Sequence, residues 1–271
     1  YCRAEPRQGG AQAVAEVWRN ITAVGARPLA ITDCLNFGNP ERPEIMGEFV
    51  GCIQGMGEAC RKLDFPVVSG NVSLYNETHG QAILPTPAIG GIGVLDDLER
   101  HADLALRRQG DNLILIGATT GHMGQTIYLR QLLDRGDGPP PPVDLAAERH
   151  NGDFVRALIA DGTVDTCHDL SDGGLLVAAA EMAMAGNIGI ELNGPDDAGF
   201  WFGEDQSRYL LAVPESDAAA ILQQAEQQQV PAQSLGRTGG EALTLNGGAP
   251  ISLAKLRRAH EAWLPGYMNN A

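Results

Sequence analysis

The chain has 271 residues, and its 44% hydrophobic and 20% charged residues are normal for a globular protein of one large or two ordinary domains. Thirty-four acidic residues against nineteen basic ones give a net charge of −15. This charge argues against nucleic acid and anionic membranes as partners, because both require a basic surface. A phosphorylated ligand stays compatible with it, since backbone amides and a metal ion attract phosphate locally.

The first block of the chain is expected to alternate helix and strand. Apolar spacing and turn residues predict, in this order, a helix over residues 11–25, a strand over Pro28–Asp33, a helix with Pro43 in its first turn, and a buried strand at Val67–Val68. Residues 81–95 are also rich in strand formers. Their prolines indicate an edge strand or a bulge, and their glycines indicate close approach of another backbone.

The charged stretch 96–109 separates this block from the next, so we expect two domains, over residues 1–100 and 108–271. The patterns of the second block predict strands at Asn112–Gly117, Asp165–His168, Ile188–Leu192 and Arg208–Val213, hairpin-like strands around Leu235 and Leu243, and helices over 123–134, 144–160, 173–185, Ser216–Gln228 and Ser252–Ala262. Together the two blocks predict an α+β protein with mixed sheets.

Small polar residues after the predicted Val67–Val68 strand are the first candidate site. They offer amides, hydroxyls and a carbonyl oxygen without bulk, from Ser69, Gly70, Asn71 and Ser73. Asp33 occupies a similar position at the end of its own strand. A carboxylate together with an amide oxygen suits Mg²⁺, which completes its ligand shell with water and phosphate. The same residue types also form ordinary turns, so the pattern alone leaves both interpretations open.

Two further motifs have competing interpretations. Gly117–Gly124 follows a strand and opens a helix, where amides approach an anion, although such turns also form for steric reasons. The run His168–Gly174 contains His, Asp and Ser, but sequence neighbours rarely form a catalytic triad. We favour capping of the following helix by Ser171 or Asp172, with His168 in the core or at a domain interface.

The remaining candidates are weaker. Cys34 has no evident base beside it, so we interpret it as a packing residue instead of a nucleophile. The polar segment Gly203–Arg208 is expected near the cleft between the two blocks. The spacing of the histidines does not match that of zinc ligands, so we expect no zinc site. The five cysteines include no C-x-x-C pair and indicate reduced thiols in a cytoplasm, and neither a membrane helix nor a signal peptide is apparent.

Several of these segments are similar to those of a known family. They are Asp33–Glu41, Gly70–Glu77, Pro85–Pro87, Gly121–His122, His168–Gly174 and the ending Trp263–Met268. They closely resemble the second half of phosphoribosylformylglycinamidine (FGAM) synthase of purine biosynthesis and, more distantly, the aminoimidazole ribonucleotide (AIR) synthetase superfamily of ATP-using enzymes. The resemblance covers essentially the whole chain. It implies an N-terminal α/β-sheet domain and a C-terminal layered α-β domain.

Residue by residue, the resemblance implies that Asp33 and Gly70 contact ATP, Asn71 supplies a Mg²⁺ ligand, and Ser73 touches the ribonucleotide substrate. The implied reaction is the ATP-dependent amidation of formylglycinamide ribonucleotide (FGAR), with ammonia from a glutaminase subunit or domain. The family's catalytic histidine and lysine lie in an N-terminal half that is absent from this sequence, so no catalytic residue is implied here. Because the chain also starts at Tyr1, we expect a C-terminal fragment that is inactive alone.

Two other interpretations stay open. The fragment could dimerise in imitation of the N-terminal half, since the family's halves are pseudo-symmetric, or it could belong to a homodimeric AIR synthetase-like enzyme. The Asn71–Glu77 run and the Trp263–Met268 ending argue against the latter. A non-catalytic nucleotide-binding or scaffold module that docks a glutaminase is the alternative from another class. ATP binding without substrate-dependent turnover would favour it.

Overall fold

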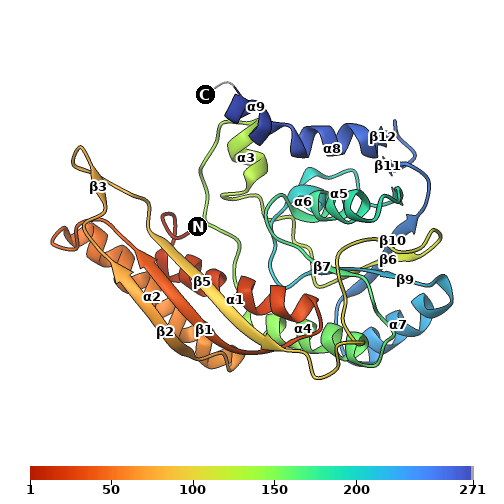
Figure 1. Ribbon diagram of the computed structural model, residues 1–271, viewed down its shortest axis with the longest axis horizontal. Helices are drawn as coiled ribbons and strands as arrows, with labels where there is room; N and C mark the ends of the chain where they lie inside the picture. Colours follow the sequence, from red (N-terminus) through yellow and green to blue (C-terminus); the bar gives the residue numbers. More distant parts are fainter. Residues whose placement is uncertain (270–271) are drawn as a thin grey trace.

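A three-stranded and a seven-stranded sheet lie toward opposite ends of the molecule in the computed structural model, which describes residues 1–269 (Figure 1). The first 95 residues form α1 (Pro6–Ala23), β1 (Arg27–Asn36), α2 (Pro43–Leu63), β2 (Val67–Ser73), β3 (Glu77–Thr78), β4 (Gln81–Ala82) and β5 (Thr86–Val94). The strand order is β2-β1-β5, with β2 parallel and β5 antiparallel to β1. The short strands β3 and β4 form a separate hairpin.

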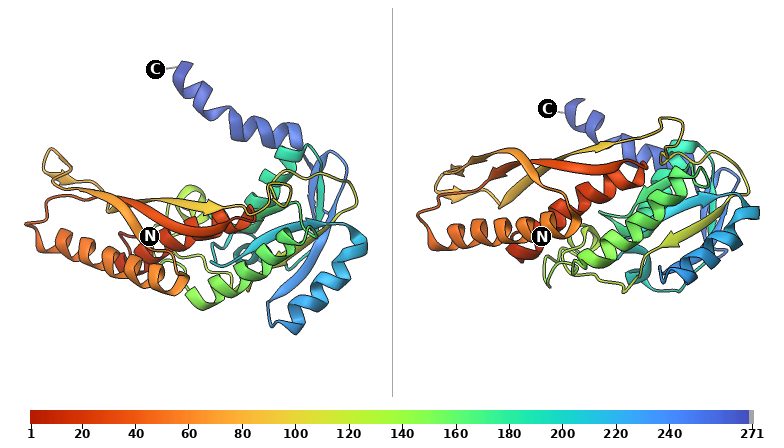
Figure 2. Two further views of the ribbon diagram at one scale, coloured as in Figure 1. Left: turned by 60° about the horizontal axis from the view of Figure 1, so that its bottom comes forward. Right: turned by 90° about the horizontal axis from the view of Figure 1, so that it is seen from below.

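Helices α1 and α2 cover one face of the three-stranded sheet (Figure 2). Glycines of β5 make this contact close, as their sequence pattern predicts. A Cβ at Gly91 would lie 2.3 Å from Val17 of α1, and one at Gly93 would lie 2.3 Å from Ile21. Side chains alternate along a strand, so Ile92 points to the opposite face, where it is 60% exposed. Within the described residues, no element covers that face in the views of Figure 2.

The predicted burial of the second strand is wrong. Val67 and Val68 are 48% and 65% exposed, because β2 is the edge strand of the sheet and pairs only with β1. The register also shifts between Ile31 and Thr32 of β1, beside these valines. Apolar β-branched residues therefore predicted the strand correctly, but they did not show whether another part of the protein covers it.

The rest of the chain builds a seven-stranded sheet between helices. Its elements are β6 (Asn112–Ile116), α3 (Ile127–Leu132), α4 (Leu145–Ala160), β7 (Cys167–Asp169), α5 (Gly174–Gly186), β8 (Ile190–Leu192), α6 (Ala198–Phe202), β9 (Tyr209–Val213), α7 (Glu215–Gln227), β10 (Ala232–Thr238), β11 (Ala242–Leu245), β12 (Ile251–Ser252), α8 (Leu253–Glu261) and α9 (Trp263–Asn269). Residues of α4 and α7 pack in one core cluster, and residues of α5 and α8 pack in another. The sheet contributes alternate residues to both, which gives three layers.

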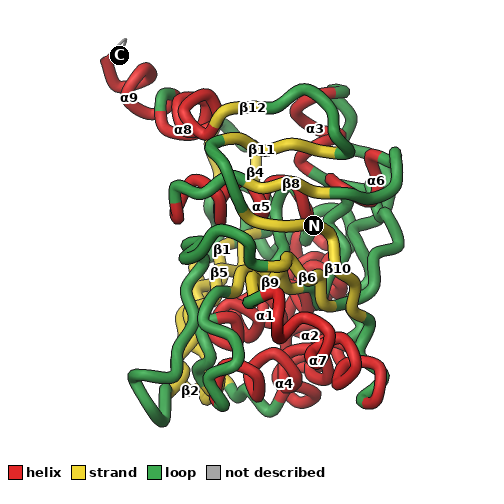
Figure 3. The backbone as a smooth tube through the Cα atoms, turned by 90° about the vertical axis from the view of Figure 1, so that its right-hand side faces the viewer, coloured by secondary structure: helices red, strands yellow, loops and turns green. Residues whose placement is uncertain are grey.

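The strand order β12-β11-β8-β10-β6-β9-β7 corrects the predicted hairpin (Figure 3). Strands β10 and β11 do not pair with each other, because β8 lies between them and is parallel to β11. The connection wraps around Gly189: Gly239 N donates to Gly189 O at 2.7 Å, and Gly189 N donates to Gly240 O at 2.8 Å. A short glycine-rich link thus passes around a strand end instead of closing a hairpin.

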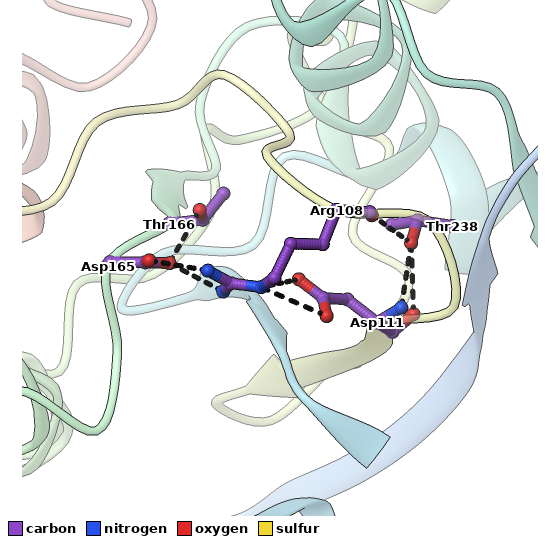
Figure 4. Close-up of polar contacts among 5 residues, drawn as sticks. All are labelled: Arg108, Asp111, Asp165, Thr166 and Thr238. Carbon is purple, nitrogen blue, oxygen red and sulfur yellow. Dashed lines mark hydrogen bonds and ion pairs between the residues drawn. The ribbon is translucent and has the colours of Figure 1, made fainter.

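Arg108 fixes the connection between the two sheets (Figure 4). Its guanidinium donates to Asp165 at 2.7 and 2.9 Å and to Asp111 at 3.0 and 3.3 Å. Thr238 Oγ1 donates to the Arg108 carbonyl and accepts from the Asp111 amide. These contacts hold the start of β6 beside the segment that enters β7 and the end of β10.

A completely buried ion pair joins the first block to the second. Arg19 of α1 contacts Glu148 of α4 at 2.8 and 3.2 Å, and it also donates to Leu170 O and to Gln206 Oε1. Ser207 Oγ donates to the second Glu148 oxygen. None of the five N–H donors of the Arg19 guanidinium reaches water, because the side chain is completely buried. The surrounding acceptors offset the cost of burying the charge. Within residues 1–269, no helix is long and apolar enough to cross a membrane.

Candidate nucleotide and substrate site

Strand pairing brings the predicted site residues into one short stretch of β1 and β2. Asp33 pairs with Gly70, and Asn36 pairs with Ser73. Asn71 lies between these pairs, opposite Cys34. Parallel pairing aligns the carboxyl ends of the two strands at the same edge, so a separation of nearly forty residues in sequence becomes direct contact.

Asp33 and Gly70 share the face that α1 and α2 cover. A Cβ at Gly70 would lie 2.1 Å from Asp33 Oδ1, so the carboxylate occupies the space that a larger residue would fill. Burial raises the pKa of Asp33 above its ordinary value. Its charge also reaches Cys60 of α2, whose thiol pKa is raised mainly by burial and further by Asp33. The carboxylate is therefore poorly solvated and has a glycine backbone beside it.

Asn71 and Ser73 fall on the opposite, uncovered face by strand alternation. Asn71 is exposed, and Ser73 is half-buried. Asn76, which lies in the Gly70–Glu77 motif but was assigned no role, bonds to Ser73 Oγ and donates to the carbonyls of Phe37 and Ser73, each at 3.0 Å. Asn76 thereby fixes the chain as it leaves β2. Only the Asn-Glu ending of the motif pointed to it.

The alternation also separates Asp33 from Asn71. Their side chains lie on different faces of one sheet, so they do not converge on a common ion in this arrangement. Within residues 1–269, no group of three or more His, Cys, Asp or Glu side chains could hold a metal. A metal that takes the Asn71 oxygen would need its other ligands from phosphate, water or another chain segment.

The Gly117–Gly124 loop already holds an anion of its own. The amides of Thr120 and Gly121 donate to Asp205 Oδ2 at 3.1 and 2.9 Å. Asp205 is buried and belongs to the polar segment before β9. An internal carboxylate thus takes two of the donors that a bound phosphate would use.

Capping of α5 by Ser171 or Asp172 is wrong. The helix begins after Gly173, which adopts a left-handed conformation (φ 82°), and neither side chain caps it. Instead, Gly173 N donates to Glu204 at 3.0 Å, and Ile127 N of α3 donates to the same carboxylate oxygen at 2.8 Å. The Tyr1 hydroxyl contacts the other oxygen of Glu204. One distant carboxylate thus stabilises two helix starts, which no local pattern indicates.

His168 forms ion pairs instead of a triad. Its ring nitrogens lie 3.3 Å from Asp169 and 3.0 Å from Glu181. Burial lowers the pKa of His168, but the hydrogen bonds and charges of the two carboxylates outweigh it and raise the pKa to about 9. Through Glu181, these contacts link His168 of β7 to α5.

The fold and this strand edge define a class of protein. Models of the AIR synthase related protein N-terminal and C-terminal domains match residues 1–95 and 108–246, and the chain belongs to this family. It is 62% identical to phosphoribosylformylglycinamidine synthase subunit PurL of Parvibaculum lavamentivorans and 60% identical to that of Bradyrhizobium diazoefficiens, over 99% of its own length in each case. It spans 37% of the length of these relatives.

A solved structure confirms the shared fold. Thermotoga maritima PurL complexed with FGAR superposes with a TM-score of 0.74 at 21% identity, over 94% of this chain and 43% of that one. These comparisons confirm the relationship that the motifs indicated and the two-part α+β architecture.

Proposed function

We propose that this chain forms one side of the active site of an ATP-dependent FGAM synthase, which amidates FGAR in purine biosynthesis. The observation that carries the proposal is the paired edge of β1 and β2, where Asp33 meets Gly70 and Asn36 meets Ser73. This edge lies in a chain 62% identical to a PurL subunit. The division into domains 1–100 and 108–271 and the cytoplasmic location belong to the same proposal.

The strand edge fits Mg-ATP as a partial site. The Asp33 carboxylate lies against the Gly70 backbone, where a Cβ would lie 2.1 Å from Oδ1, and we assign both residues to the nucleotide contact. Asn71 presents an exposed amide oxygen suited to Mg²⁺, and Ser73 presents a hydroxyl toward the ribonucleotide. When bound, Mg-ATP supplies the phosphoryl group that activates the amide oxygen of FGAR. The residues of this chain bind and orient; they offer no strong nucleophile at this edge.

The uncovered sheet face supports an incomplete site. Asn71 and Ser73 lie on that face together with the exposed Ile92. An apolar residue beside polar ligand candidates suits coverage by more protein, which would exclude water from the reaction. We assign this role to the N-terminal part present in the longer relatives, with a second copy of this chain as the alternative. A glutaminase subunit or domain would supply ammonia, and the solved PurLQS structure from Thermotoga maritima, which shares this fold, gives a precedent for an assembly of several subunits.

The test measures ADP release with FGAR, Mg-ATP and ammonium. It compares this chain alone with the chain fused to the N-terminal part of the Parvibaculum lavamentivorans relative. Turnover only in the fusion supports the proposal. FGAR-dependent turnover by this chain alone would mean that the chain assembles a complete site, for example as a dimer, and would contradict the half-site proposal. ATP binding by the fusion without FGAR-dependent turnover would identify a scaffold module and contradict the proposal.

A further inference from the structure

Asn76 ties the chain that leaves β2 to the chain that leaves β1. Its side-chain nitrogen donates to the carbonyls of Phe37 and Ser73, each at 3.0 Å, and lies 3.2 Å from Ser73 Oγ. Its side-chain oxygen lies 3.3 Å from the same Ser73 hydroxyl. The two carbonyls fix the orientation of the amide group, because only its nitrogen end can donate to them.

The fixed amide determines how the Ser73 hydroxyl is used. The amide nitrogen carries two hydrogens, and the carbonyls of Phe37 and Ser73 take both at the shorter distances. The Ser73 hydroxyl then donates its own hydrogen to Asn76 Oδ1, which accepts no other hydrogen bond from residues 1–269. The lone pairs of Ser73 Oγ are left free on the uncovered face of the small sheet.

The backbone at Asn76 has contacts of its own. The Tyr75 amide donates to Gly38 O at 2.9 Å, and the Asn76 amide donates to Phe37 O at 3.2 Å. On the other side, the Ile83 amide donates to Asn76 O at 3.1 Å. Loss of the Asn76 side chain should therefore release the Ser73 hydroxyl, while these three backbone contacts keep the turn in place.

We propose that Asn76 is a positioning residue, which presents the Ser73 hydroxyl to the ribonucleotide as a hydrogen-bond acceptor. The inference rests on the proposed function, in which Ser73 contacts FGAR, and it names the kind of group that Ser73 contacts. Because Asn76 Oδ1 holds the hydroxyl hydrogen, Ser73 Oγ accepts from a donor on the ligand, a ribose hydroxyl or an amide N–H. A phosphate group offers acceptor oxygens, so it does not match this hydroxyl.

A double-mutant cycle tests the positioning role in the chain fused to the N-terminal part of its relative. The KM for FGAR and the KM for ATP are measured for wild type, Asn76→Ala, Ser73→Ala and the double variant. Asn76→Ala should raise the KM for FGAR about three- to tenfold, the range of one hydrogen bond, and should leave the KM for ATP unchanged. The double variant should be no weaker than Ser73→Ala, because Asn76 acts through the Ser73 hydroxyl.

A second measurement identifies the group that Ser73 contacts. The riboside form of FGAR, which lacks the phosphate, is used as an inhibitor that competes with FGAR. Its inhibition constant should rise in Ser73→Ala by the same factor as the KM for FGAR, because both ligands carry the ribose hydroxyls and the amides. An inhibition constant equal to that of wild type would show that Ser73 donates to the phosphate and would overturn the assignment. This comparison holds even if Asn76→Ala does not fold.

Asn151 provides the matched control. It is a buried asparagine of α4 whose side-chain amide donates to the Ser207 carbonyl at 2.9 Å. Asn151→Ala should lower the midpoint of thermal unfolding and leave the KM for FGAR unchanged. The comparison separates the general loss of a hydrogen bond from asparagine to the backbone from the loss of the contact with Ser73.

Three kinetic results from an active wild-type fusion would overturn this inference alone. They are an equal rise in the KM for FGAR when Asn76→Ala is made in the wild-type and in the Ser73→Ala background, a parallel rise in the KM for ATP, and an equal rise in Asn151→Ala. A wild-type fusion without FGAR-dependent turnover would instead contradict the proposed function, and this inference with it.

Discussion

The Asp33 carboxylate owes its position to a glycine on the neighbouring strand. Both residues were predicted as ligand candidates from their positions at strand ends, but their contact could not be predicted, because it depends on the register between β1 and β2. A shift of one residue would place Asn71 or Ser69 opposite Asp33. It would also move the side chains of β2 to the opposite face of the sheet. The sequence therefore predicted Asp33 and Gly70 as ligand candidates, but it did not predict that they pair with each other.

Gly70→Ala should destabilise the fold by about 1–3 kcal/mol, because the new methyl group would overlap Asp33 Oδ1. In an Asp33→Ala background the penalty should be clearly smaller, since the overlapping carboxylate is gone. Urea unfolding of the four proteins, followed by circular dichroism, measures the coupling. An equal penalty in both backgrounds would show that Asp33 does not limit the space at Gly70.

His168 should make stability depend on pH. Its pKa is about 9 in the folded protein against an ordinary value of 6.5, so its charged form stabilises the fold. This contribution, up to about 3 kcal/mol, is fully present below pH 6.5 and is lost as the pH rises through 9.

Replacement by glutamine isolates this effect. The difference in free energy of unfolding between wild type and His168→Gln should be largest near pH 6 and should shrink steadily up to pH 9.5. Glu181→Gln should weaken the same pH dependence, because it removes one of the two carboxylates beside the ring. A wild-type to His168→Gln difference that stays constant with pH would contradict the ion-pair account.

At the scale of elements, α1 is the helix that ties the two sheets together. Its buried face supplies Trp18 to the core beside the small sheet and Arg19 to the ion pair with α4. Helical spacing predicted a helix over residues 11–25, whereas α1 begins earlier, at Pro6, and ends at Ala23. An arginine in the middle of an apolar face gave no indication of its buried partner. Glu148 looked equally like a surface residue of α4, since isolated charges usually lie on the surface.

Glu148→Ala should lower the free energy of unfolding by about 3–5 kcal/mol, because it leaves the buried Arg19 charge without its carboxylate. Arg107→Ala is the matched control. It breaks an exposed i,i+4 ion pair with Asp103 and should cost about 0.5 kcal/mol or less. Equal costs for the two variants, measured by denaturant unfolding, would mean that the buried pair does not hold the domains together.

Helix ends were predictable where the signal is local. Pro43 begins α2 as its position indicated, and Asp144 caps α4 with its own side chain. The start of α5 was not predictable, because its cap comes from Glu204, about thirty residues further along the chain. The same limit explains the incorrect hairpin, since the placement of β8 between β10 and β11 is a long-range choice.

For the whole molecule, the family motifs and the alternation of helices and strands predicted a two-part α+β protein, and the family match confirms it. The uncovered face of the small sheet could not be predicted, because strand patterns do not show which faces lack a covering layer. That face carries Asn71 and Ser73, and the chain spans 37% of its longer relatives. We therefore infer that this face is half of a synthetase active site, and the proposed function depends on it.

The most direct test replaces Asn71 in the chain fused to the N-terminal part of its relative. Asn71→Ala should lower FGAR-dependent ADP release at least about tenfold and should shift the Mg²⁺ requirement to higher concentration, because a metal oxygen is lost. Arg107→Ala, which removes a side chain from an exposed ion pair outside the small sheet, should leave both unchanged. Equal turnover and equal Mg²⁺ dependence in wild type and Asn71→Ala would contradict the assignment of this face to the active site.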